Sequence, residues 1–399
     1  MPSSVTVDVA IVGSGPSGLA LAAALSGIGL KIVLLEVQPE AQLRDPAFDG
    51  REIALTHRSI RVLRELGAWD RLPPDQISPL RRARVMDGPS TFELGFEPAG
   101  EDRLGALVSN HLIRQALYQS TTGPGDVSIL AGQPVVACEI GTGAHRTRLR
   151  LQDGTDIRAR LLVAADSRFS QTRDRLGVGV DIHRLGRSML VCRMHHDQDH
   201  DQVATEWFDY GQTVATLPLN GPEGSGGVSS IVLTLPSPQI DGLLKMDESA
   251  FEAELEKRLK GRLTGLRLVS TRHAYPMAIT WSHNFCGDGY ALIGDAAVGM
   301  HPVTAHGFNL GLRSADALAR RIRRAVASNR DIGAATVLRP YEAEHRRAAL
   351  PLYEATHALV RLFTNEATPA RLARGAALRI AQAARPLRRA VAAMLTDAN

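Results

Sequence analysis

The amino-acid sequence predicts an α/β fold: a nucleotide-binding unit, interrupted by a mainly antiparallel β-sheet and followed by C-terminal helices. Three stretches carry this prediction. An apolar run with a glycine-rich turn occupies 7–36, alternating polar and apolar residues fill much of 181–281, and a second apolar run with a glycine-rich loop occupies 287–322. Apolar runs next to helical patterns are typical of parallel sheets, whereas a period of two indicates antiparallel strands.

The first stretch begins with apolar residues 7–12, typical of a buried parallel strand, and continues with the motif GSGPSG. In such a motif Gly13 makes the tight turn, Gly15 lets the backbone approach a pyrophosphate, and Gly18 lets the next helix pack closely on the strand. We expect that helix over 19–26 and a second strand over 32–35.

Glu36 ends the second strand, about 20 residues after the central glycine. A carboxylate at this place accepts hydrogen bonds from a ribose, as the adenosine half of FAD or NAD requires. Strand, glycines, helix, strand and acid in this order therefore predict dinucleotide binding.

Composition narrows the class of protein. The chain has 399 residues, of which 44% are hydrophobic and 22% charged, as in soluble globular proteins of two or three domains. A net charge of +4 is too small to indicate nucleic-acid binding. Three scattered cysteines argue against a disulfide framework or zinc site, and no signal peptide or membrane-spanning run is seen. We expect a cytoplasmic protein without a metal.

Polar residues and two prolines follow Glu36, so we expect a loop over 37–55 and then a helix that ends at Gly67. Arg51, near the end of this loop, is either a solvated charge or a phosphate contact. Asp166 follows a buried strand and either bonds a ribityl chain or ribose, or caps the next helix. Further elements are expected as strands at 81–86, 135–140 and 147–151 and as helices at 110–118 and 249–259.

The third stretch contains a short buried strand, 291–293, which ends at Gly294 and Asp295. A loop with Pro302 and Gly307 then leads into a helix from about Phe308. In one interpretation, the backbone N–H groups of this loop and of the helix N-terminus face an anion or an electron-rich ring. In the other, the segment only connects the strand to the helix.

Three motifs in this order resemble the FAD-dependent aromatic-ring hydroxylases, the single-component flavoprotein monooxygenases. They are GSGPSG with Glu36, AADSRFSQTR at 164–173, and GDAAVGMHPVTAHGFNLGL at 294–312. The segment FDGREIALTHRSIRVLRELGAWDRL at 48–72 is similar to the ubiquinone-biosynthesis hydroxylases of that family. The resemblance extends to about residue 350.

The resemblance implies a Rossmann-like FAD-binding domain of the glutathione-reductase type, in its aromatic hydroxylase variant. The FAD-binding domain would comprise 1–72, 100–178 and 284–332, the substrate domain 73–99 and 179–283, and a C-terminal helical segment 333–399.

The resemblance further implies one bound FAD. FAD rather than FMN is expected because FMN has no adenosine half to occupy the glycine loop and the acid. The cofactor-binding residues would be Gly13, Gly15, Ser17, Gly18, Glu36, Arg51, Asn110, Asp166, Gly294, Asp295, Gly307 and Asn309. Residues near the reacting ring would be His301, Pro302 and His306, whose histidines either tune a proton near the flavin or only hydrogen-bond within the loop.

Proteins similar to this one reduce the flavin with NAD(P)H and form a C4a-hydroperoxide with O2, which transfers oxygen to an electron-rich ring carbon. The substrate we expect is a polyprenylated phenol or quinol in ubiquinone biosynthesis. Three alternatives stay open: hydroxylation of a soluble aromatic or secondary metabolite, a flavin reductase on the same scaffold, and a catalytically silent flavin-binding subunit of a biosynthetic complex.

The sequence departs from the family pattern at three places: Ser167 replaces a Gly, Val298 a His, and His306 a Gln. Residues 371–395 have arginines opposite an apolar arc. This pattern favours a helix that packs on the protein itself, and leaves open peripheral contact with the inner face of a membrane. A ubiquinone-synthesis complex as partner, and the choice between monomer and homodimer, also stay open.

Overall fold

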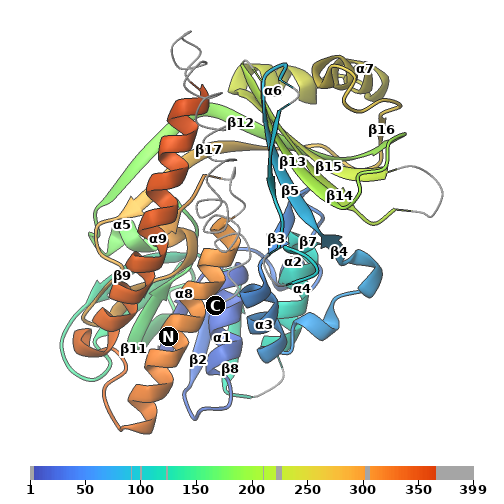
Figure 1. The fold of residues 1–399 in the computed structure, drawn as a ribbon. Coiled ribbons are helices and arrows are strands. Elements are labelled where there is room, and N and C mark those ends of the chain that lie inside the picture. The colour runs from blue at the N-terminus through green and yellow to red at the C-terminus, as the bar shows by residue number, and fades with distance from the viewer. Residues whose placement is uncertain are drawn as a thin grey trace.

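The computed structural model describes residues 4–90, 92–98, 101–122, 125–209, 211–221, 227–301 and 306–364. Two large sheets lie on either side of a small one, and long helices cover the first large sheet (Figure 1). Pro302 and the segment 371–395 lie outside the described residues. Among those described, no helix is long and apolar enough to cross a membrane.

The first sheet has eight strands in the order β18-β19-β11-β1-β2-β8, with β10 pairing with β11 and β9 with β10. The pairs β1–β2, β1–β11, β2–β8 and β11–β19 are parallel, as expected for a nucleotide-binding sheet. Its strands are β1 (Ser4–Val12), β2 (Ile32–Glu36), β8 (Val127–Ala131), β9 (Val135–Ile140), β10 (Thr147–Leu151), β11 (Asp156–Ala164), β18 (Cys286–Gly287) and β19 (Tyr290–Leu292).

Helices pack around this sheet, with α1 against α4 and α8, and α8 against α9. They are α1 (Pro16–Leu25), α2 (Glu40–Arg44), α3 (His57–Glu65), α4 (Asn110–Thr121), α5 (Gln171–Arg175), α8 (His306–Ala327) and α9 (Ala335–Thr364). The helix expected over 19–26 begins earlier, at Pro16, because a proline is favourable in the first turn, where its missing N–H is not needed.

One expectation about local structure was wrong. The loop expected over 37–55 contains the short helix α2 and the strand β3 (Glu52–Leu55). A five-residue helix is too short to show a period, and β3 forms only by pairing with the distant β7. The helix expected from about Phe308 is α8, which the structure describes from His306, so that His306 and Gly307 belong to the helix.

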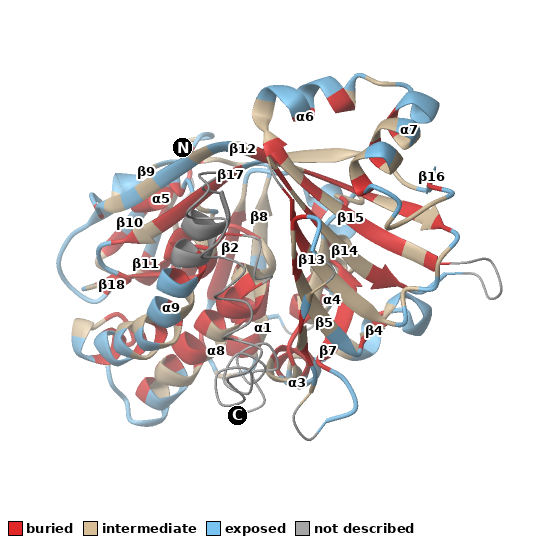
Figure 2. Ribbon diagram, turned by 45° about the horizontal axis from the view of Figure 1, so that its top comes forward, coloured by how far each residue is buried: buried red, intermediate tan, exposed pale blue. Residues whose placement is uncertain are grey.

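The second large sheet has nine strands, mostly antiparallel as predicted, in the order β20-β17-β12-β15-β14-β13-β5-β6 with β16 beside β12. Figure 2 shows α6 (Ser237–Leu244) and α7 (Glu248–Leu259) over one of its faces, where Trp207, Leu233 and Phe251 are buried. The strands are β5 (Arg82–Asp87), β6 (Glu93–Phe96), β12 (Val180–His196), β13 (Val203–Asp209), β14 (Gln212–Leu219), β15 (Gly227–Pro236), β16 (Arg267–Leu268), β17 (His273–Ser282) and β20 (Val298–Gly299).

A three-stranded sheet, β3-β7-β4, connects the two halves through β7 (Gly105–Ser109) and β4 (Ser78–Leu80). β4 lies in the range predicted for the substrate domain but pairs with β7 from the range predicted for the FAD-binding domain. The domain boundaries therefore stay a prediction. Short 3-10 helices occur at Trp69–Arg71, Pro74–Gln76 and Gly294–Ala296.

Candidate functional site

The strand register brings the three sequence motifs to one edge of the first sheet. Val12, the last residue of β1, lies between Leu35 of β2 and Ala164 of β11, and Ala164 in turn pairs with Leu292 of β19. Glu36 is the last residue of β2, and the GSGPSG turn, Asp166 and Asp295 follow β1, β11 and β19. Ligands of open parallel sheets bind beyond the carboxyl ends of the strands, so this edge is the candidate site.

The three glycines of the first motif differ in what a side chain would meet. Gly13 has φ +104°, and a Cβ there would lie 2.5 Å from the carbonyl oxygen of Ala165. A Cβ at Gly18 would overlap the carbonyl oxygen of Gly13. At Gly15, however, a Cβ would meet no protein atom within 4 Å. Gly13 and Gly18 are thus required by the fold, whereas the open space at Gly15 fits a bound pyrophosphate.

Ser17 joins the first motif to the third. A Cβ at Gly294 would lie 2.6 Å from the Oγ of Ser17, and one at Gly311 would lie 2.7 Å from it. Gly294 has φ +59°, a conformation that favours glycine. The hydroxyl of Ser17 is thus packed between two glycines, and its place in the site is set by close approach of α1 and α8.

Glu36 is held at the end of β2 by two backbone N–H groups. Its Oε2 accepts a hydrogen bond from the N–H of Ser14 at 2.8 Å, and its Oε1 accepts one from Gln38 at 3.0 Å. Each carboxylate oxygen retains a further acceptor site, so this geometry fits a carboxylate that also accepts hydrogen bonds from a ribose.

Arg51 and Asn110 meet at Asp49, a residue that the sequence analysis did not single out. Arg51 Nη2 lies 2.6 Å from Asp49 Oδ2, and Asn110 Nδ2 donates to the same oxygen at 2.8 Å. The hydroxyl of Tyr275, from β17, donates to the Asp49 carbonyl at 2.7 Å. Burial acts to raise the pKa of Asp49, but the charge and hydrogen bonds of Arg51 hold it below its ordinary value. The ion pair with Asp49 orients the Arg51 guanidinium. An acid two residues before Arg51 is the sequence pattern from which this pair could have been predicted.

Asp166 caps α5. Its carboxylate accepts hydrogen bonds from the Ser170 hydroxyl at 2.5 Å and from the Thr172 N–H at 3.0 Å. The next residue, Ser167, has φ +110°. This is the position where the resembling family usually has glycine, and such a φ is strained for a residue with a side chain. A serine in place of glycine at position 167 therefore introduces local backbone strain beside the candidate site.

Asp295 forms an ion pair that motif analysis did not predict. Arg168 Nη2 lies 3.0 Å from Asp295 Oδ2, and Arg168 Nη1 donates to the carbonyl of Ala278 in β17 at 3.0 Å. Arg173 is fully buried and donates to the carbonyls of Arg168 and Ala296 at 3.1 and 3.3 Å. These two arginines fix the second motif to the third, and Arg168 also reaches the nine-stranded sheet.

Of the remaining predicted residues, His306, Gly307 and Asn309 lie at the start of α8, and His301 precedes that helix in the chain. His301 and His306 are buried, each with 7% of its surface exposed. Asn309 is occupied on both sides of its amide: Oδ1 accepts from the Thr56 N–H at 3.1 Å, and Nδ2 donates to the Ala54 carbonyl at 2.8 Å. Its side chain thus joins α8 to β3 and α3. Gly307 is not sterically required, because a Cβ there would meet only Met300 Cβ, at 3.8 Å.

An ion pair with a buried carboxylate joins the small sheet to the nine-stranded sheet. Arg193 Nη2 of β12 lies 2.7 Å from Glu52 Oε1 of β3, and the same guanidinium donates to the Ser109 hydroxyl at 2.5 Å. The Glu52 side chain is 1% exposed. Burial raises the pKa of Glu52 above its ordinary value, although the Arg193 charge opposes this. No motif predicted this pair, because its partners are far apart in sequence.

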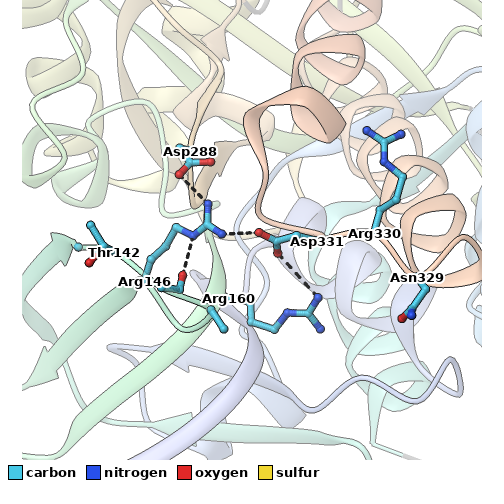
Figure 3. A pocket seen from close by; sticks show the side chains of 10 residues that line it. Thr142, Arg146, Arg160, Asp288, Asn329, Arg330 and Asp331 are labelled. Atoms are coloured by element: carbon cyan, nitrogen blue, oxygen red, sulfur yellow. Dashed lines mark hydrogen bonds and ion pairs between the residues drawn. The ribbon is translucent and has the colours of Figure 1, made fainter.

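A cavity of about 630 Å³ lies elsewhere, beside the turn between α8 and α9 (Figure 3). Arg146 there pairs with Asp288, at 2.6 Å, and with Asp331, and Arg160 pairs with Asp331 at 3.7 Å. Asp288 precedes β19, so this cavity is at the opposite end of that strand from Asp295. Its ion pairs join Arg160 of β11 and the connections β9–β10, β18–β19 and α8–α9, and the cavity is separate from the candidate site. Among the described residues no cluster of His, Cys, Asp or Glu has metal-binding geometry.

Two curated relatives are similar to nearly the whole chain. Ubiquinone hydroxylase UbiM of Neisseria meningitidis is 45% identical over 395 residues, which cover 98% of this chain and 84% of that protein. Ubiquinone hydroxylase UbiL of Rhodospirillum rubrum is 34% identical over 383 residues, covering 96% of this chain and 87% of that protein.

Solved structures show the same fold. PqsL of Pseudomonas aeruginosa in complex with 2-aminobenzoylacetate has a TM-score of 0.76 at 22% identity, covering 90% of this chain and 97% of that chain. p-Nitrophenol 4-monooxygenase PnpA of Pseudomonas putida has a TM-score of 0.77 at 17% identity, covering 99% of both chains. The predicted fold class is confirmed.

A family model described as FAD binding domain matches residues 6–356. This match and the two ubiquinone hydroxylases confirm the resemblance found in the motifs, the expected cofactor FAD, and the expected enzyme class of FAD-dependent hydroxylase. The chain belongs to the FAD binding domain family.

Proposed function

We propose that this protein hydroxylates the aromatic ring of a polyprenylated phenol or quinol in ubiquinone biosynthesis, with NAD(P)H as reductant and O2 as the source of the new oxygen. The balance is one ring C–H, O2, NAD(P)H and H⁺ converted to one ring C–OH, NAD(P)⁺ and water. The substrate assignment rests on the 45% identity, over nearly the whole chain, to a protein named ubiquinone hydroxylase.

Residues at the strand ends would hold the cofactor. The N–H groups of the glycine loop and the open space at Gly15 suit the pyrophosphate, and the fixed carboxylate of Glu36 suits the adenosine ribose. Arg51, oriented by Asp49, would contact phosphate, and Asp295 would contact the ribityl side. Bound FAD supplies the redox chemistry, namely electron exchange with NAD(P)H and activation of O2.

The protein's own part in the reaction would be to exclude water and to orient the ring. The nine-stranded sheet lies next to the predicted flavin residues through Tyr275 and Ala278 of β17, which contact Asp49 and Arg168. This contact supports a reaction site between the two large sheets, with the nine-stranded sheet as its second wall. His301 and His306, both buried, remain candidates for a proton near the flavin.

The test is an analysis of quinone intermediates in a strain that lacks the gene. We expect loss of ubiquinone and accumulation of a precursor that lacks one ring hydroxyl. The wild-type gene should restore ubiquinone, and a Gly15→Val gene should not. An unchanged quinone profile would contradict the proposal and favour a soluble aromatic substrate.

A polyprenylated substrate resides in the bilayer, so the proposal includes peripheral contact with the membrane. The basic, amphipathic sequence of 371–395 is the candidate segment. Flotation with anionic liposomes should require the residues after Glu366 and should weaken in high salt. If the truncated protein floats equally well, the segment does not provide the contact.

A further inference from the structure

The two faces of the nine-stranded sheet can be distinguished by register. Trp207 in β13 pairs with Met86 in β5 and with Val214 in β14, and all three are buried in the core beneath α6 and α7. Successive side chains of a strand point to opposite faces. Glu206, which precedes Trp207, therefore lies on the face away from α6 and α7.

Glu206 belongs to a row of residues that crosses the sheet on this second face. Its partners are Val85 in β5 and Ala215 in β14. The row continues through paired residues of the next strands, which are Val232, Val191 and His273. Apart from Glu206 and His273, every member of the row is apolar.

The far end of this row meets the predicted flavin residues. A Cβ at Gly50 would lie 2.8 Å from Val191 Cγ2 and 3.0 Å from His273 Cδ2. Gly50 stands between Asp49 and Arg51, and its φ of +75° favours glycine. The face that carries Glu206 is thus the face turned toward the candidate FAD site.

The carboxyl group of Glu206 has no hydrogen-bond donor or cation paired with it among the residues that the structure describes. Its side chain is half-buried between Val85 and Ala215. Burial raises the pKa of Glu206 to about 8, so the group is largely protonated at neutral pH. A protonated carboxyl can donate one hydrogen bond and accept others. The cost of burying it without a partner would be offset by a ligand hydroxyl.

We propose that Glu206 hydrogen-bonds the phenolic hydroxyl of the ring substrate and thereby orients the ring on the apolar row. This inference rests on the proposed function, because it takes a phenol or quinol as the ligand. Val85, Ala215 and Val232 would provide the apolar surface around the ring, and Glu206 the polar group that fixes its orientation. The phenolic O–H would donate to the Glu206 carboxyl oxygen, which the methyl ether cannot do, so Glu206 would distinguish a free phenol from its ether.

The experiment titrates the FAD-loaded protein with a phenol that carries one short prenyl chain, and separately with the methyl ether of that phenol. Binding is followed by the change in flavin absorbance. In Glu206→Leu, we expect phenol binding to weaken about tenfold, the typical worth of one hydrogen bond, and ether binding to change little. Glu206→Gln should retain most of the preference for the phenol, since an amide still donates and accepts.

Glu93→Leu is the matched control, because Glu93 is a half-exposed residue on the edge strand β6 of the same sheet. It pairs with Met86 and so lies on the opposite face, and its preference for phenol over ether should equal that of the wild type. FAD content and melting temperature are measured for every variant. Glu206→Val, with a residue favoured in strands, repeats the test if the leucine variant loses FAD.

An unchanged phenol-to-ether ratio in Glu206→Leu would overturn the inference, and so would loss of FAD in both apolar variants, which would make Glu206 structural. If the wild type still hydroxylates the phenol in these cases, the proposed function stands without this residue. If neither probe perturbs the wild-type flavin nor stimulates NAD(P)H oxidation, the proposed function fails and the inference fails with it.

Discussion

In the eight-stranded sheet the residues that we assign to FAD follow the carboxyl ends of the strands, whereas in the nine-stranded sheet Arg193 and Glu206 project from within strands. The first arrangement leaves a trace in the sequence, because tight turns require glycine and each turn directly follows an apolar run. The arrangement in the nine-stranded sheet leaves no such trace in the sequence, because its residues come together only through the register of the strands. Motifs therefore predict the cofactor residues of this enzyme, whereas the side chains that we propose for substrate binding become apparent only in the three-dimensional structure.

The largest effect that we expect comes from Gly15→Val. No protein atom lies within 4 Å of a Cβ at this position, so the fold should persist while the side chain occupies the place of the pyrophosphate. The purified variant should contain no FAD and should keep the melting temperature of the wild-type apoprotein. Gly18→Val is the contrast, because its side chain would overlap Gly13 and should destabilise the fold itself. Normal FAD content in Gly15→Val would refute the assignment.

The next effect tests the contact between the two regions. Arg193→Met leaves the Glu52 carboxylate, 1% exposed, without its cation, and should lower the free energy of unfolding by about 3 kcal/mol. The double variant Arg193→Met/Glu52→Gln should recover most of this loss in urea unfolding. Arg103→Met, which breaks an exposed pair with Asp102, should cost far less, because water and salt screen exposed charges. If Arg193→Met and Arg103→Met lowered the unfolding free energy equally, the Arg193–Glu52 pair would contribute no more than an exposed pair.

A smaller effect is expected at the end of β19. Asp295→Ala should weaken FAD binding to the apoprotein about tenfold, or 1.4 kcal/mol, because Asp295 stands at the ligand-binding edge. The control is Asp288→Ala, at the opposite end of the same strand, which should leave FAD affinity unchanged. Fluorescence titration of the apoproteins measures both. If the two variants bound FAD with similar affinity, Asp295 would have only a structural role.

The smallest effect concerns a buried group that we regard as structural, in contrast to Glu206. His345 of α9 lies 5.3 Å from the ring of Phe285 and 5.9 Å from that of Tyr341, measured between centroids. Burial lowers its pKa to about 3. The unfolded chain then binds a proton that the folded protein does not, so stability is lost as pH falls below about 6.5.

The expected loss at His345 is about 1 kcal/mol between pH 6.5 and 5.5. His345→Leu should reduce this pH dependence of the unfolding free energy, and substitution of the exposed His145 by alanine should not. Phenol binding should be unaffected in both. If the His345 variant altered the ratio of phenol to ether affinity, His345 would not be purely structural, and the difference that we draw between it and Glu206 would be wrong.

Sequence reasoning located the glycine turn, Glu36 and the strand before Asp295 because each depends on its immediate neighbours. It did not find the Arg168–Asp295 ion pair, whose partners are 127 positions apart, or the Arg193–Glu52 pair, which are 141 apart. Asn309 stays a predicted cofactor residue, but its motif did not reveal that its amide also bonds the Ala54 carbonyl and the Thr56 N–H. Local patterns determine where strands and turns occur, but not which distant side chains they bring together.

The most direct test of the proposed reaction is hydroxylation under ¹⁸O2. The FAD-loaded protein is incubated with NADH or NADPH and a phenol that carries a short prenyl chain, and the product is analysed by mass spectrometry. We predict a product that has gained one oxygen atom, labelled from O2, with NAD(P)H consumed in proportion. Oxidation of NAD(P)H with no labelled product, or oxygen that comes from water, would contradict the assignment of this chain as a flavin-dependent ring hydroxylase.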